Sequence, residues 1–210
     1  GIRYLVDSQQ TNGLFKVRDG NNYSHPMAAY ALCEAYSLTK VPMLKTAAER
    51  AMRPIILGQH PSGGWDYNMR QSERDDTSYM GWCAQAVKAA TIAEDLDVPG
   101  LAEAYRLSSE GFRKNAHPDG GFGYISPARG GLTSVGTLCM QLMGAGNAQE
   151  VQKSLALMDT WTLSWLEGKP AGSPQYYFYY ASQCMFHAGG KRWANWNAIM
   201  LPEYVKNQKV

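Results

Sequence analysis

The chain has 210 residues with a formal net charge of +2, and 45% of its residues are apolar while 18% are charged. This composition supports one sizeable hydrophobic core, and the near balance of charge, with no basic run, argues against nucleic acid or an acidic membrane surface as a partner. No stretch approaches the length of a transmembrane segment.

Helical patterns follow one another along the chain, and no strand-like run interrupts them. Alanine-rich, mostly apolar segments alternate with amphipathic segments that carry Lys, Arg and Glu. This alternation predicts inner helices that line an interior and outer helices that face solvent, so the fold class is all-α. Ser24 stands where an N-cap is expected. In chain order the predicted helices cover about 2–10, 24–39, 44–57, 76–93, 101–115, 131–143, 148–166, 175–187 and 193–208.

When the sequence is aligned with itself, two alignment columns, each a set of equivalent positions, recur roughly every fifty residues. This recurrence indicates a repeat protein. One column holds all four cysteines, and because none forms a Cys-x-x-Cys pair, we expect buried free thiols. The other column is a glycine turn followed by an aromatic residue, in which His60 and His117 are expected to bond local backbone. The cysteines are Cys33, Cys83, Cys139 and Cys184, and the turns run from Gln9 to Phe15, from Gln59 to Trp65 and from His117 to Phe122.

These columns define a single predicted domain over 1–210 with repeats at about 9–58, 59–116, 117–170 and 171–208. Within it, residues 59–65 read Gln-x-x-x-Gly-Gly-Trp and residues 76–82 read Asp-Thr-Ser-x-x-Gly-Trp before a small-residue helix. This pattern resembles the prenyltransferase and squalene-oxidase repeat family, and within it bacterial repeat proteins of unassigned function. The resemblance implies the α/α toroid of terpenoid cyclases and protein prenyltransferases.

A closed ring in that superfamily needs more hairpins than the four predicted here, so we expect an incomplete ring. The segment from Tyr204 to Gln208 also matches the segment from Tyr4 to Gln9 in repeat phase. We therefore expect the chain to be part of a longer repeat array, with the remaining repeats or a second copy as its partner.

The acidic run before the predicted helix at 76–93 is the sharpest catalytic candidate. It is similar to the Asp-x-Asp-Asp-Thr acid of squalene-hopene cyclases, with Glu73 in place of the first aspartate. The resemblance implies that Asp75 is the proton donor and Asp76 its acidic neighbour, which requires a carboxyl group kept protonated in an apolar cavity. The alternative interpretation is an N-cap, worth about 0.5–2 kcal/mol to the helix. Both interpretations stay open at the level of sequence.

Other candidate ligand contacts come from the same resemblance and from an aromatic cluster at 176–180. Zinc sites of protein prenyltransferases pair an Asp-x-Cys motif with a remote histidine, but this chain has no Asp-x-Cys, so neither a metal nor a cofactor is expected. Five consecutive aromatic residues point all round a helix, so some must face a surface. The candidate ligand-binding residues are His25, Glu73, Thr77, Tyr176, Tyr177 and Tyr180.

Two functions from different classes follow. The first is a noncatalytic binding or scaffold domain whose concave inner-helix surface holds an isoprenoid, another small molecule or a protein. The second is a terpenoid cyclase-like or prenyltransferase-like enzyme that acts on an isoprenoid, with Asp75 and Asp76 as its acid. The first is favoured because an incomplete ring leaves its cavity open to water, which quenches a carbocation.

Overall fold

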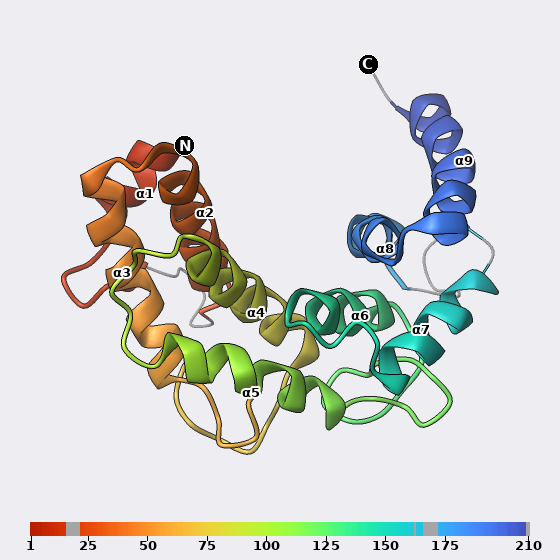
Figure 1. The fold of residues 1–210 in the computed structure, drawn as a ribbon, viewed down its shortest axis with the longest axis horizontal. Helices are drawn as coiled ribbons and strands as arrows, with labels where there is room; N and C mark the ends of the chain where they lie inside the picture. The colour runs from red at the N-terminus through yellow and green to blue at the C-terminus, as the bar shows by residue number, and fades with distance from the viewer. Residues whose placement is uncertain (16–21, 162, 166–171, 209–210) are drawn as a thin grey trace. The chain divides into compact units, whose positions relative to one another are not determined.

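The computed structural model describes residues 1–15, 22–161, 163–165 and 172–208, and in these ranges every regular element is a helix (Figure 1). The all-α prediction is therefore confirmed there, and none of these helices is long and apolar enough to cross a membrane. The helices are α1 (Ile2–Ser8), α2 (Ser24–Thr39), α3 (Pro42–Leu57), α4 (Thr77–Ile92), α5 (Leu101–Arg113), α6 (Leu132–Leu142), α7 (Gln149–Asp159), α8 (Pro174–Ala188) and α9 (Gly190–Asn207).

The chain divides into two compact units. Unit 1 comprises Gly1–Asn115 together with Tyr124–Ser126, and it contains α1 to α5. Unit 2 comprises Ala116–Gly123 together with Pro127–Val210, and it contains α6 to α9.

In unit 1 the inner helices α2 and α4 pack against each other, and each carries one outer helix, α3 on α2 and α5 on α4 (Figure 1). Small buried side chains such as Ala29 and Ala84 let the two inner helices approach closely. The hydroxyl of Tyr23 donates to the carbonyl of Ser78 at 3.2 Å and joins the starts of the inner helices. Each alanine-rich helix of this unit thus packs on the amphipathic helix that follows it in the chain, and the lining of an interior by α2 and α4 stays a prediction.

The two inner helices of unit 1 begin in different ways. Asp76 is the N-cap of α4, and its side chain accepts a hydrogen bond from the backbone N–H of Tyr79. The expected cap at Ser24 is wrong, because Ser24 is already the first residue of α2 and the preceding Tyr23 has helical dihedral angles. No side chain caps α2, whereas its second N–H, that of His25, donates to the carbonyl of Asn22.

Three glycine turns share one hydrogen-bond pattern, which supports the repeat prediction at the level of local structure. In each turn a glycine with φ between 86° and 91° lies so close to the next outer helix that an added Cβ would fall 2.0–2.6 Å from a carbonyl oxygen of that helix. The turns make His117 equivalent to His60, as the shared loop pattern predicted, and both equivalent to Gln10. The donor and acceptor pairs are Gln10 N to Leu14 O, His60 N to Gly64 O, and His117 N to Gly121 O, at 2.8, 2.9 and 2.9 Å.

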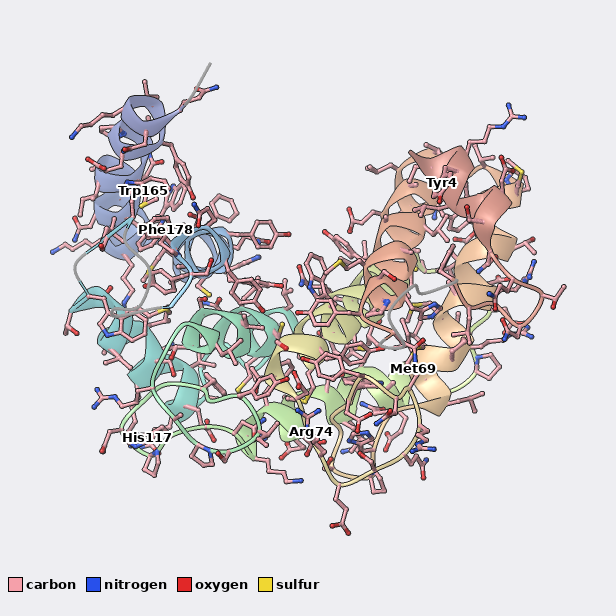
Figure 2. All side chains as sticks on the ribbon, turned by 180° about the vertical axis from the view of Figure 1, so that it is seen from behind. Tyr4, Met69, Arg74, His117, Trp165 and Phe178 are labelled. Carbon is pink, nitrogen blue, oxygen red and sulfur yellow. The ribbon has the colours of Figure 1, made fainter. Side chains whose placement is uncertain are left out.

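In unit 2, α8 packs on both α6 and α9, and α7 packs on α6. The outer helix predicted at 148–166 is too long, because α7 ends at Asp159. The indole of Trp165 instead contacts Phe178 of α8 (Figure 2) and donates to a carboxylate oxygen of Glu203 in α9. Residue 166 lies outside the described residues. Within the aromatic cluster of α8, Tyr179 is 45% exposed while its neighbours Phe178 and Tyr180 are buried.

All four cysteines are buried free thiols, as the sequence predicted. Burial raises the pKa of the Cys33 thiol to about 12, with a smaller contribution from the nearby Glu34 carboxylate. These side chains therefore act as small apolar groups in the two cores.

Candidate functional site

The acidic pair is positioned by the second glycine turn and by the start of α4. The indole of Trp65 is buried and donates to the carbonyl of Ile55 at 2.7 Å, which fixes the end of the turn. The backbone N–H of Asp76 then donates to the carbonyl of Trp65 at 3.0 Å. This bond brings the loop of residues 66–74 back onto the turn, so that Asp75 and Asp76 are both buried.

Asp76 acts as a capping residue with a charged neighbour. Its Oδ1 accepts from the Tyr79 N–H at 3.1 Å and from the Ser78 hydroxyl at 2.6 Å. Its Oδ2 lies 3.3 Å from the guanidinium of Arg74. Oδ1 thus caps the helix, while Oδ2 accepts no hydrogen bond and has the ion pair with Arg74, so the helix start gains the negative charge that its dipole favours.

Asp75 is held as a carboxylate by three donors. Its Oδ1 lies 2.8 Å from His60 Nδ1 and accepts from the Ser62 hydroxyl at 2.9 Å, while its Oδ2 lies 3.0 Å from the ammonium of Lys114. Burial by itself would raise the pKa of Asp75, but the hydrogen bonds from His60, Lys114 and Ser62 outweigh it and hold this pKa below its usual value. The structure therefore favours the charged form of Asp75.

The carboxylate of Asp75 lies directly against the backbone of the turn. A Cβ added to Gly64 would fall 2.2 Å from Asp75 Oδ1. On its other side the turn contacts α5, where a Cβ on Gly111 would fall 2.5 Å from the Gly64 nitrogen. Only glycine at both positions permits this three-layer contact of helix, turn and carboxylate.

A serine extends the buried network beyond His60. Ser72 Oγ lies 3.3 Å from His60 Nε2, so Ser72, His60 and Asp75 follow one another in the order of a nucleophilic triad. The hydroxyl of Ser72, however, is closer to the buried carboxylate of Asp66, to which it donates at 2.9 Å. A hydroxyl that gives its only proton to Asp66 is not activated by His60, so the arrangement is a hydrogen-bonded network and not a nucleophile.

Next to this network the guanidinium of Arg74 lies over two phenol rings. Its central carbon is 5.5 Å from the centre of the Tyr67 ring and 5.4 Å from that of Tyr124, at cation–π distance. The two phenol oxygens are 2.7 Å apart. The side-chain amide of Asn115 is buried and donates to the carbonyl of Asp75 at 2.9 Å, which ties the same loop to the end of α5.

The other candidate ligand-binding residues differ in their burial and belong to both units. His25 is buried in unit 1, where its Nε2 lies 2.9 Å from the carbonyl of Ala51. Thr77 is buried and its hydroxyl accepts from Asn115, while Glu73 is exposed. In unit 2, Tyr177 and Tyr180 are buried and Tyr176 is half-buried.

Sequence reasoning found the acidic pair but missed most of its partners. His60 was expected to bond local backbone, and its main chain does pair with Gly63 and Gly64, but its ring also contacts Asp75 and Ser72. Two adjacent buried carboxylates require positive partners, which was a usable signal for the neighbouring Arg74. No local pattern pointed to Lys114. In the described part of the chain, no three His, Cys, Asp or Glu side chains are placed to hold a metal ion.

No protein-family model, curated protein or solved structure matches the chain. The resemblance to the prenyltransferase and squalene-oxidase repeat family therefore remains a prediction that depends on the sequence motifs.

Proposed function

We propose that this chain is a noncatalytic binding or scaffold domain, built from helical repeats of the prenyltransferase and squalene-cyclase type in a partial α/α toroid. The observation that supports it most is the environment of Asp75. An acid that protonates an alkene must hold its proton in the resting state, whereas Asp75 is surrounded by donors that favour its anion.

The second carboxylate does not supply the missing acid. Asp76 uses one oxygen for the cap of α4 and the other for Arg74. Removal of either interaction weakens the start of an inner helix, so the acidic pair is explained by structure. The cyclase-like or prenyltransferase-like enzyme remains the competing hypothesis that the experiment below tests.

We place the contact surface of this proposal on the inner helices of unit 1. The rings of Tyr30 in α2 and Trp82 in α4 are half-buried and contact each other, with their centres 6.4 Å apart. Amphipathic aromatic side chains of this kind supply a large contact area at low entropic cost, and they are common at binding hot spots. An isoprenoid, another apolar small molecule or an apolar protein segment fits this pair.

The experiment is native mass spectrometry of the protein as isolated from cells, beside a Trp82→Ala variant and an Asp75→Asn, Asp76→Asn variant. A bound molecule that the Trp82 variant loses and the double variant retains supports the proposal. An isoprenoid-sized molecule that only the double variant loses supports the enzyme instead. If none of the three samples carries a bound molecule, a small-molecule ligand is excluded and a protein partner becomes the hypothesis. Affinity capture with the wild-type chain, and with the Trp82→Ala variant as control, then tests for that partner.

A further inference from the structure

A cavity of unit 2 lies where α7 and α8 end and α9 begins. It has a volume of about 910 Å³, within the range of small-molecule sites in proteins. Two tryptophans, Trp161 and Trp196, line it together with the apolar side chains of Met158, Met185 and Ile199. The site is separate from Asp75 and from the aromatic pair Tyr30 and Trp82, all of which belong to unit 1.

The connection between α8 and α9 explains why the cavity is not closed by packing. Gly189 and Gly190 both have positive φ, at 65° and 52°, and a Cβ on either would meet no atom within 4 Å. These two residues turn the chain sharply, so that α9 leaves α8 at once and buries only Trp196 and Met200. The apolar wall that results is accessible from solvent.

The polar part of the wall carries a positive excess. Arg192 pairs with Asp159 at 2.8 Å, which leaves one further cation, Lys191, whose side chain meets no described carboxylate within ion-pair distance. The first turn of α9 also carries no acidic residue. A ligand that fills an apolar, tryptophan-lined cavity and leaves a negative group beside Lys191 would complement both features.

From this we infer that the cavity binds a small amphipathic anion, with a flat aromatic or branched apolar body and one carboxylate or sulfonate group. The body stacks between Trp161 and Trp196, and the anionic group lies at the mouth beside Lys191. This site is independent of the proposed contact surface in unit 1, so either can fail without the other.

The probe for this inference is 8-anilinonaphthalene-1-sulfonate, compared with N-phenyl-1-naphthylamine, which has the same ring system without the charge. We expect one saturable site for the sulfonate, seen as a blue-shifted emission and as energy transfer from tryptophan excited at the red edge of its absorption. The uncharged probe is expected to bind more weakly.

Two pairs of variants locate the site. Lys191→Glu should weaken sulfonate binding about tenfold and leave the uncharged probe unchanged, because it reverses one partly screened charge. Lys206→Glu makes the same change on the same helix away from the cavity and should have no effect. Ala198→Phe should fill the cavity and abolish binding of both probes, while Ala194→Phe, outside the cavity lining, should preserve it.

Three results would overturn the inference. The first is non-saturable binding of several sulfonate molecules, which marks exposed apolar surface and not a cavity. The second is equal affinity for the charged and uncharged probes, which would show that the negative group of the ligand contributes nothing to binding. The third is binding that Ala198→Phe leaves intact in a protein whose circular dichroism is unchanged, which places the site elsewhere.

Discussion

His60 Nδ1 lies 2.8 Å from Asp75 Oδ1, and both side chains are completely buried. This contact joins the second glycine turn to the residue before the cap of α4. Because the carboxylate is removed from water, its charge is tolerable only while its donors stay in place. The pair therefore makes the turn and the inner helix depend on each other.

The first prediction concerns the loss of the ring. His60→Ala leaves the charge of Asp75 with Ser62 and Lys114 as its remaining donors, and we expect the free energy of unfolding to fall by about 3–5 kcal/mol. His117→Ala is the matched control, since His117 occupies the same place in the third turn but its ring, among the described residues, accepts the N–H of Asp119 and contacts no carboxylate. We expect the control to cost less than about 1 kcal/mol. Urea unfolding measures both, and equal losses would show that the contact with Asp75 carries no particular stability.

The second prediction separates the cap of α4 from its charge. Asp76→Ala should lower the free energy of unfolding by about 1–2 kcal/mol through the lost cap, whereas Asp76→Asn should cost less than about 1 kcal/mol. Asparagine keeps the acceptor for the Tyr79 N–H and loses only the pair with Arg74, whose side chain is 40% exposed and screened by water. If thermal unfolding showed the two variants to be equally unstable, the charge and not the cap would be the important feature.

The fold was predictable from the sequence where the signal is local. Alanine-rich periodicity predicted the helices α2 and α4, and an Asp before Thr-Ser suggested the N-cap interpretation, for which the structure identifies Asp76. The cap predicted at Ser24 is wrong because serine is merely a preferred N-cap residue, and the backbone already has helical dihedral angles at Tyr23. The end of α7 was missed because Trp165 fits a helical pattern equally well, while its indole contacts α8 and α9 in the folded chain.

The candidate site was predictable only in part, because its partners are distant in sequence. Asp75 and Asp76 were visible as a motif, but Lys114 comes from the end of α5 and meets Asp75 only after the turn has packed on that helix. The same applies to Asn115, whose amide reaches the carbonyl of Asp75. Periodicity identifies which helices pack, whereas the register that brings these side chains together is set by the close contact of Gly64 and Gly111.

The third prediction tests that close contact. Gly64→Ala would place a methyl group 2.2 Å from Asp75 Oδ1, so we expect a loss of about 3 kcal/mol or more from overpacking in a buried polar site. Gly130→Ala is the control, because a Cβ there meets no atom within 4 Å and the backbone does not have positive φ. The control should be neutral or stabilise by up to about 1 kcal/mol. Chemical denaturation of both variants measures the change in the free energy of unfolding. A Gly64→Ala variant as stable as the wild type would contradict the three-layer contact.

The last prediction concerns pH and His25. Burial lowers the pKa of His25 from 6.5 to about 4, against the smaller opposite effect of its hydrogen bond to the carbonyl of Ala51. Since the folded pKa lies below the unfolded one, the unfolded chain binds more protons between these values, and stability falls as the pH drops from about 6.5 to about 4. The expected loss is about 3 kcal/mol over this window, with none above it. Asp75, whose folded pKa is lowered from 3.8, loses its contribution to stability only at lower pH, so the two effects separate.

The variant His25→Gln keeps a donor for the carbonyl of Ala51 without a titrating ring. Urea unfolding of this variant at a series of pH values should show a flat stability profile between pH 4 and 6.5. An unchanged slope in this variant would assign the pH dependence to another group.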